Sequence, residues 1–311
     1  MFGLLNLRKP SGPTSRDCVN SIQKLMRPEK VGHAGTLDPL ASGVLLVLVG
    51  QAVRLTDAVH TLSKEYIGTF QLGVTSESTD CETPLVALES AQLLDREDIE
   101  AQLPSFLGTI EQSPPKYSAV WIGGKRAHEL ARAGKEFEMP SRQVVIASLE
   151  VTYFCYPYFE LKMTCGTGTY VRSLGRDIAR NLGSDAVMTK LVRTAIGPFK
   201  LESSCNLETL TSRQSIEENL APARDGVKHW PQTFPSEETL LLLEQGKQVN
   251  ESDLNSAVEI ASDFAAAIDS EGRLRALIKR IAKSSWRADK CFLIKEQAGV
   301  DQEPPHRSSF A

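Results

Sequence analysis

The feature that most constrains this chain is a glycine-rich stretch, residues 32–43, that carries a single carboxylate. Its sequence is GHAGTLDPLASG, with three glycines, one proline and Asp38. Glycine adopts backbone conformations that other residues avoid, and the residue before a proline is pushed towards an extended conformation. We therefore expect the stretch to turn closely and to present the Asp38 side chain rather than bury it. A carboxylate in such a loop also fits a turn residue or a helix cap, so Asp38 alone does not establish a site.

Length and composition limit the classes of protein that this chain can represent. The chain has 311 residues, of which 41% are hydrophobic, which suits one large domain and a small one. No apolar run approaches the roughly eighteen residues of a membrane-spanning helix, and the N-terminus lacks a signal-peptide pattern, which predicts a cytoplasmic protein without a membrane partner. The six cysteines lack CxxC spacing and the five histidines are far apart. We expect no disulfide framework, no metal and no cofactor.

The net charge of −4 is unevenly distributed along the sequence. The first 35 residues contain six basic and two acidic side chains, whereas residues 201–270 contain four basic and thirteen acidic ones. This asymmetry favours a polyanionic partner for the N-terminal part. Solvated faces of unrelated helices would explain either half alone.

Further motifs precede and follow the glycine-rich stretch in a fixed order. The sequence KPSGPTS (9–15) predicts a turn after a strand, with Thr14 or Ser15 as the N-cap of a helix. KEY (64–66) begins an alternating strand that leads through LGVTSESTD to Asp80. GTYVRSLGRDIA (168–179) is a glycine-rich entry to a helix without a P-loop or dinucleotide fingerprint. LVRTAIGPF (191–199) follows that helix.

Together with GHAGTLDPLASGVL, these motifs resemble the TruB family of tRNA pseudouridine synthases over about residues 3–200. The resemblance implies that Asp38 is the essential catalytic residue, that Tyr66 stacks on the target base, that Tyr170 lines the pocket and that Arg172 pairs with Asp38. A buried carboxylate needs a neighbouring cation to stay ionised, which independently favours such an arginine. The predicted supporting residues are Asp80 on the other side of Arg172, Leu191, Gly35 and Thr36.

Residues 113–142 are predicted to grip RNA. They contain six basic and three acidic side chains, interleaved with aromatic ones. Phosphates require positive charge and unstacked bases require flat surfaces, although an ordinary helical hairpin would also fit. The resemblance places the family's RNA-binding thumb here, and it implies that His33 fills the gap left by a flipped uridine. The residues predicted to contact RNA are Lys9, His33, Lys64, Lys116, Lys125, Arg126, Arg132, Arg142 and Arg193.

The resemblance implies an α+β pseudouridine synthase fold with a mixed, mainly antiparallel sheet. We expect a catalytic domain over 1–230, a small PUA-like β domain over 231–300 and a disordered tail over 301–311. Short strands are expected at 240–246, 264–272, 275–281 and 290–295. The chain departs from the family pattern at four positions, which are Arg8, Arg16, His128 and Val187.

The predicted activity is isomerisation of the T-loop uridine 55 of tRNA to pseudouridine, by base flipping, cleavage of the C1′–N1 bond and reattachment through C5. The expected partner is tRNA, without a guide RNA, and the expected state is a monomer. One alternative is an RNA-binding protein that folds tRNA without catalysis. Another is the catalytic subunit of a guide-RNA particle.

Overall fold

The computed structural model describes residues 2–256 and 260–293. These residues form two compact units, one comprising Phe2–His229 and the other beginning at Trp230. Residues 301–311, which were predicted to be disordered, lie outside the described part. No helix in the described ranges is both long and apolar enough to cross a membrane.

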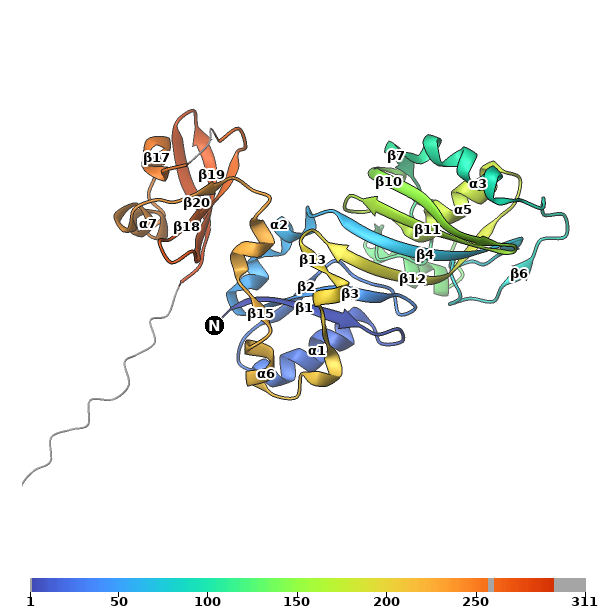
Figure 1. The fold of residues 1–311 in the computed structure, drawn as a ribbon, viewed down its shortest axis with the longest axis horizontal. Coiled ribbons are helices and arrows are strands. Elements are labelled where there is room, and N and C mark those ends of the chain that lie inside the picture. The colour runs from blue at the N-terminus through green and yellow to red at the C-terminus, as the bar shows by residue number, and fades with distance from the viewer. Residues whose placement is uncertain (1, 257–259, 294–311) are drawn as a thin grey trace, which may run out of the picture. The chain divides into compact units, whose positions relative to one another are not determined.

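The larger unit is built on one mixed, mainly antiparallel sheet of eleven strands (Figure 1). Eight strands follow the order β14-β1-β3-β12-β4-β11-β10-β7, with β2, β13 and β15 paired at the side of this path. Only the β1–β14 and β3–β12 pairs are parallel. The strands are β1 (Gly3–Lys9), β2 (Val31–Ala34), β3 (Ser42–Val49), β4 (Lys64–Leu72), β7 (Gly108–Gln112), β10 (Arg142–Cys155), β11 (Tyr158–Cys165), β12 (Ala186–Ile196), β13 (Phe199–Lys200), β14 (Cys205–Asn206) and β15 (Leu220–Ala221).

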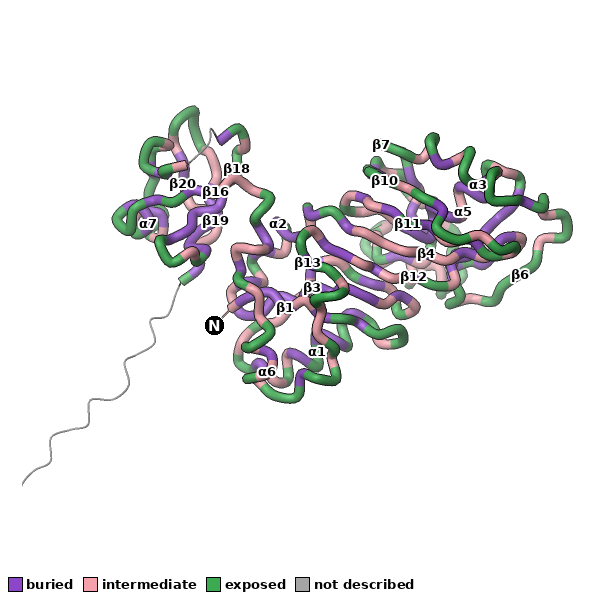
Figure 2. Tube along the Cα trace, viewed as in Figure 1, coloured by how far each residue is buried: buried purple, intermediate pink, exposed green. Residues whose placement is uncertain are grey.

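Strand β3 is the innermost element of the N-terminal part of the sheet. Its sequence SGVLLVLV is buried at every position after the first, as the purple tube in Figure 2 shows. A continuous apolar run of this kind is typical of a strand covered on both faces. Leu45, Val47 and Val49 pack in one cluster with Val19 and Ile22 of the first helix. This packing fixes the start of β3, and therefore the end of the loop that carries Asp38.

Two of the helices in this unit, α1 (Ser15–Met26) and α5 (Val171–Asn181), lie where the sequence predicted them. The first helix begins after Thr14, whose side chain accepts from the Asp17 backbone N–H while the Asp17 carboxylate accepts from Thr14, so the N-cap prediction is confirmed. Helix α5 approaches β4 so closely that a methyl group on Gly175 would lie 2.1 Å from the Phe70 ring. The helices of this unit are α1 (Ser15–Met26), α2 (Thr56–His60), α3 (Arg96–Gln102), α4 (Ala127–Arg132), α5 (Val171–Asn181) and α6 (Arg213–Glu217).

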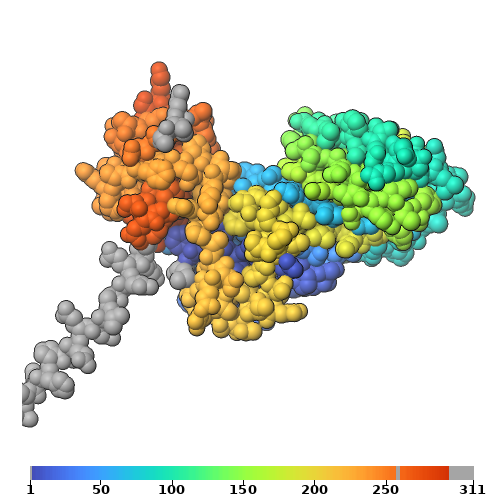
Figure 3. All heavy atoms as spheres, viewed as in Figure 1, coloured from blue at the N-terminus to red at the C-terminus, as the bar shows by residue number. Residues whose placement is uncertain are grey.

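The segment after β12 returns to the N-terminal strand. β14 pairs with β1 in parallel, and β15 pairs with β1 in the antiparallel sense. In the space-filling view, the yellow-orange atoms of this segment lie against the blue N-terminal ones (Figure 3). Two short hairpins lie outside the main sheet, formed by β5 (Val74–Thr75) with β6 (Val86–Ala87) and by β8 (Trp121–Ile122) with β9 (Lys125–Arg126).

The described residues of the smaller unit form a five-stranded sheet, one α-helix and a short 3-10 helix, Glu251–Leu254. Trp286 is fully buried in its core, beside Leu240 and Leu243. Its sheet order is β16-β18-β19-β20-β17. The elements are β16 (Gln232–Thr233), α7 (Glu237–Glu244), β17 (Val249–Asn250), β18 (Phe264–Ile268), β19 (Leu274–Ala282) and β20 (Ser285–Cys291).

Of the strand predicted at 290–295, residues 290–291 are the end of β20, residues 292–293 are outside it, and residues 294–295 lie outside the described part. Another predicted strand of this unit is wrong. Residues 240–246 were expected to be a strand, but Leu240 to Glu244 belong to helix α7. The run of four leucines does not distinguish a strand from a buried helix, and Ser236 decides the matter because its side chain caps the helix by accepting from the Thr239 N–H. The predicted α+β class, with a mainly antiparallel sheet and a C-terminal β-rich part, is confirmed. The PUA-like character of that part stays a prediction.

Candidate active site

The Asp38 loop, residues 35–41, joins β2 to β3 and is held by hydrogen bonds from outside itself. The Ser15 hydroxyl at the start of α1 accepts from the Leu37 N–H at 2.9 Å and donates to the Leu37 carbonyl at 3.0 Å. The Gly12 N–H donates to the Pro39 carbonyl at 2.8 Å. These bonds fix the peptide groups on both sides of Asp38, so the backbone position of the carboxylate is set by α1 and by the turn before it.

Lys9 holds the same loop from beneath. Its side chain has no exposed surface, and its ammonium donates to the carbonyls of Ala41 at 2.7 Å and Pro10 at 3.0 Å. Burial lowers the pKa of this ammonium. The prediction that Lys9 contacts RNA is therefore wrong, because a buried group bonded to backbone carbonyls is not available to phosphates.

Arg193 completes the support of the loop from β12. It is 1% exposed, and its guanidinium donates to the carbonyls of Gly35 at 2.9 Å and Val44 at 2.7 Å. Gly35 has a φ of +88°, and a methyl group there would lie 3.3 Å from Arg193 Nη1. The expectation that Arg193 contacts RNA is corrected in the same way, since its donors are directed to the Gly35 carbonyl in the loop and to the Val44 carbonyl in β3.

Arg172, near the start of α5, lies between two carboxylates. Its Nη2 is 3.1 Å from Asp38 Oδ2, and its Nη1 is 3.2 Å from Asp80 Oδ2. The same guanidinium donates to the carbonyls of Ser78 at 2.9 Å and Tyr117 at 3.0 Å. The side chains of Arg172 and Asp80 are 5% and 4% exposed, whereas that of Asp38 is 36% exposed. Asp80 and the carbonyls thus fix the guanidinium, and Asp38 is the carboxylate that remains open.

Opposing influences act on the ionisation of Asp38. The protein around Asp38 removes part of the water from its carboxyl, which raises the pKa, and the Arg172 guanidinium opposes this rise. Asp80 and Glu82 add to the rise through their negative charge. Arg172 serves two carboxylates at once, so its stabilisation of the Asp38 anion is shared.

Asp38 and Arg172 line a cavity of about 370 Å³. Tyr66 of β4 enters it, with its hydroxyl 3.5 Å from Arg193 Nη1, and burial raises the pKa of this phenol. Tyr170 lies on the opposite strand-to-helix turn, where the Gln112 side chain bonds both its N–H and its carbonyl. The predicted residues that line this cavity are His33, Gly35, Thr36, Asp38, Lys64, Tyr66, Arg142, Tyr170, Arg172, Leu191 and Arg193.

The predicted RNA-contacting residues outside the cavity are exposed or partly exposed and lie on the 113–142 segment. Lys116 and Lys125 are exposed. Arg126 stacks on the Trp121 ring at 4.2 Å, and Arg132 forms an ion pair with Glu82. Among the basic residues of the segment, Arg142 differs from these surface cations because it lines the cavity, where it lies 4.6 Å from the centre of the Tyr170 ring.

Lys64 and His33 differ from expectation in their surroundings. Lys64 is 5% exposed, its ammonium donates to the His60 carbonyl and to Thr167 Oγ1, and burial lowers its pKa to about 8. Two donors of the Lys64 ammonium are thus engaged within the protein, and its contact with RNA stays a prediction. His33 faces the cavity, and burial lowers its pKa to about 4, so its imidazole is neutral at pH 7.

The four departures from the family pattern have separate surroundings. His128 Nδ1 lies 3.0 Å from the Ser118 carbonyl, and Val187 is buried in β12. Arg16 is exposed and its charge contributes to the low pKa of His33. Arg8 ties β1 to the returning segment by donating to Leu201 and Ser204.

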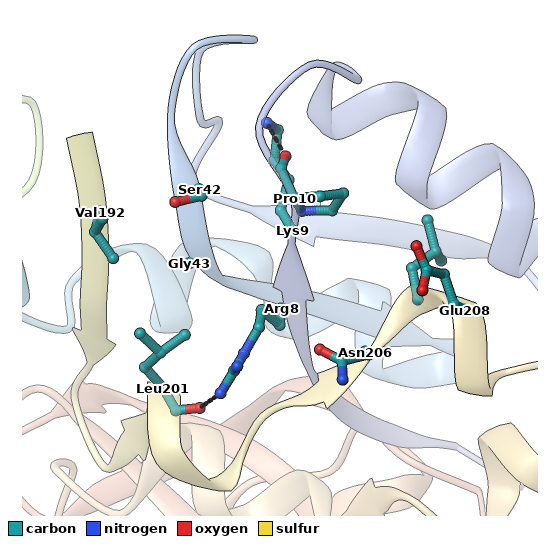
Figure 4. Close-up of a pocket in the computed structure, with 10 residues that line it drawn as sticks. Arg8, Lys9, Pro10, Ser42, Gly43, Val192, Leu201, Asn206 and Glu208 are labelled. Atoms are coloured by element: carbon teal, nitrogen blue, oxygen red, sulfur yellow. Dashed lines mark hydrogen bonds between the residues drawn. The ribbon is translucent and has the colours of Figure 1, made fainter. Parts of the chain in front are cut away.

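Arg8 also borders a second cavity of about 450 Å³, which Figure 4 shows. The Arg8 side chain points to the Leu201 carbonyl, 3.0 Å away, while Asn206 and Glu208 lie on the opposite wall. Because Arg8 is engaged with the chain itself, this cavity offers no counterpart to the Asp38–Arg172 pair. The chemistry of the site therefore belongs to the first cavity.

Sequence reasoning missed His60 and the structural use of Ser15 and Gln112. His60 lies at the end of α2 in a sequence without a motif, TDAVHTL, and only the fold brings it to Gly35. In the described residues, no three His, Cys, Asp or Glu side chains are grouped in a way that could hold a metal ion.

Comparison with known proteins decides the family. Residues 23–171 match the N-terminal domain of the TruB family of pseudouridylate synthases. A tRNA pseudouridine synthase B from Rhodopirellula baltica is 40% identical over 263 residues, which cover 80% of this chain and 76% of the relative. The chain belongs to the TruB family. The corresponding protein of Dehalococcoides mccartyi is 34% identical over 296 residues, covering 94% of this chain and 97% of the relative.

Solved structures agree with this TruB family assignment at the level of the fold. A chain in a crystal structure of a Cbf5-Nop10-Gar1 complex superimposes with a TM-score of 0.73 and 26% identity, covering 94% of this chain and 85% of that one. A chain of an H/ACA ribonucleoprotein bound to a substrate RNA containing 2′-deoxyuridine gives a TM-score of 0.73 at 24% identity, covering 95% of this chain and 86% of that one.

Proposed function

We propose that this TruB family member is a tRNA pseudouridine synthase that isomerises the T-loop uridine 55 of tRNA. The observation that carries the proposal is the open carboxylate of Asp38, 3.1 Å from a buried guanidinium, in a cavity that Tyr66 also enters. Its relatives of similar length are tRNA pseudouridine synthases by name.

The reaction needs no external group. The C1′–N1 bond of the uridine breaks, the uracil turns and C5 forms the new bond to C1′, while C5 loses a proton and N1 gains one. Asp38 acts on the sugar, where its anion is suited to attack C1′, to remove a sugar proton or to stabilise positive charge. Burial raises the pKa of Asp38, and Arg172 opposes this rise and so favours the anion.

The target uridine reaches Asp38 only after it leaves the stacked T loop, at a cost of roughly a few kcal/mol. Tyr66 stacks on the flipped uracil and Tyr170 lines the other side of the pocket. His33, neutral and at the rim of the Asp38 loop, fills the space that the base vacates. The exposed cations of residues 113–142 bind the phosphates of the T stem.

The finer parts of the proposal concern partners and location. The chain carries its own cationic segment beside the cavity, so we expect it to act on tRNA as a monomer and without a guide RNA. A cytoplasmic location is expected because tRNA is the substrate.

The test is pseudouridine formation in an unmodified tRNA transcript, mapped by position, with no guide RNA present. A matched transcript carries cytidine in place of the T-loop uridine. We expect one new pseudouridine at that uridine and none in the cytidine transcript. Binding and refolding of both transcripts without any pseudouridine would instead support the alternative, a tRNA-folding protein that acts without catalysis.

A further inference from the structure

We infer that His60 is a positioning residue of this site, whose neutral imidazole holds the Asp38 loop by accepting a hydrogen bond from the Gly35 N–H. The inference rests on the proposed function, because it concerns the geometry of the same carboxylate. It uses a residue that none of the sequence motifs includes.

The first observation is the bond itself. The Gly35 backbone N–H donates to His60 Nε2 at 3.0 Å. Since the Gly35 amide can only donate, Nε2 must accept, and the proton of the neutral ring must be on Nδ1. The carbonyl of Gly35 accepts from Arg193 at 2.9 Å. Both backbone polar groups of Gly35, which lie in successive peptide units, are therefore held three residues before Asp38.

The second observation is that the backbone of His60 holds the facing wall of the cavity. Its carbonyl accepts from Lys64 and from Thr167 Oγ1. Thr167 belongs to the glycine-rich turn that leads to Tyr170 and Arg172. His60 thus connects the segment carrying Asp38 with the segment carrying its arginine, through its ring on one side and its carbonyl on the other.

The charges around His60 favour the accepting form of the ring. Burial lowers the pKa of His60, Lys64 and Arg193 lower it further, and Asp57 opposes them. His33 also lies close to His60, because the charge of a protonated His60 would lower the pKa of His33. A protonated imidazole would present a donor to the Gly35 N–H, so protonation of His60 would break the bond and release the loop.

The test compares two substitutions of His60. The amide oxygen of His60→Gln can accept at the position of Nε2, whereas His60→Leu keeps a comparable bulk without an acceptor. His229→Leu is the matched control, because His229 Nε2 lies 2.8 Å from Thr61 Oγ1 at the end of the same helix and does not line the cavity. For each variant we would measure the single-turnover rate of pseudouridine formation, the Kd for tRNA and the hydrogen exchange of the Gly35 amide.

We expect His60→Leu to lower the single-turnover rate by about ten- to hundredfold, because a small displacement of a reacting group has effects of that size. Its Kd for tRNA should change by less than about twofold, and the Gly35 amide should exchange about tenfold faster, as expected for the loss of one hydrogen bond. His60→Gln should stay within about threefold of the wild type in all three measurements, and His229→Leu should match it. On the acid side, the rate of His60→Gln should fall less steeply than that of the wild type, because the variant lacks the imidazole whose protonation breaks the bond to Gly35.

An unchanged rate in His60→Leu, or a lower rate with unchanged exchange at Gly35, would overturn the inference. A wild-type protein that makes no pseudouridine would refute the proposed function instead. The exchange of Gly35 would still decide whether His60 holds the loop.

Discussion

The Asp38 loop and the 113–142 segment both depend on basic side chains, but they use them in opposite ways. Lys9 and Arg193 are buried, and their donors are directed to backbone carbonyls at the two ends of the loop. Lys116 and Lys125 are exposed on the other segment. The buried cations therefore fix the position of the Asp38 carboxylate, whereas the exposed cations are able to bind a polyanion. Four predictions follow from this difference.

The largest effect is expected at Arg172, where the buried cation serves two carboxylates. In Arg172→Met, Asp38 and Asp80 face each other without a cation, and breaking a buried pair in this way costs about 3–5 kcal/mol. We expect the free energy of unfolding to fall by that amount and pseudouridine formation to fall by at least about a thousandfold. Adding Asp80→Asn should restore stability but not activity. A double variant as unstable as Arg172→Met would contradict this account.

Lys9→Met and Lys125→Met test the comparison directly, because the same substitution is made in each region. Lys9→Met leaves the carbonyls of Ala41 in the loop and of Pro10 after β1 without this donor, which should lower the free energy of unfolding by about 2–3 kcal/mol. Lys125→Met should change it by less than about 0.5 kcal/mol. The slope of the logarithm of the tRNA binding constant against the logarithm of salt concentration should decrease by about one in Lys125→Met and stay unchanged in Lys9→Met. A salt slope altered by Lys9→Met would show that the division by burial is wrong.

His33 should make the free energy of unfolding of the larger unit depend on pH. Its pKa is lowered from 6.5 to about 4, so between these values the unfolded chain binds a proton that the folded chain does not. Stability from the neutral ring is therefore complete above pH 6.5 and is lost as the pH falls towards 4. As the pH falls through this range, the free energy of unfolding measured in urea should decrease by about 2 kcal/mol more in the wild type than in His33→Asn. Parallel curves for the two proteins would exclude this role.

The smallest effect separates two cations of the 113–142 segment. Arg132 already pairs with Glu82, whereas Lys116 is exposed. A neutralised cation contributes less to the attraction of a polyanion, so Arg132→Met should weaken tRNA binding by less than about twofold and Lys116→Met by about threefold at low salt. Filter binding at two salt concentrations measures both. Equal losses would mean that the pairing with Glu82 opens on binding.

The sequence was sufficient for much of the fold and for the centre of the site. Alternation predicted β4, and Thr14 and Ser15 predicted the start of α1, because these signals are local. The sequence motifs contain Asp38, Tyr66 and Arg172, which were predicted as site residues. The fold brings these three residues to one cavity.

Burial was the property that the sequence did not reveal. Lys9, Lys64 and Arg193 are basic residues of the kind that contact RNA. Only the packing of β1, β4 and β12 shows that their charged ends face carbonyls. His60 belongs to no motif because its partner, Gly35, is 25 residues away. The leucine run of α7 was ambiguous because a fully apolar segment has no period.

The most direct test of the account compares Asp38→Asn with Asp80→Asn in single-turnover pseudouridine formation on one tRNA transcript. Each substitution removes a negative charge that pairs with Arg172 and keeps the shape of the aspartate side chain. Only Asp38 is open to the cavity. The account predicts no product from Asp38→Asn at unchanged tRNA affinity, and a reduced but measurable rate from Asp80→Asn. Product formed by Asp38→Asn at the wild-type rate would contradict the central claim that Asp38 is the reacting carboxylate.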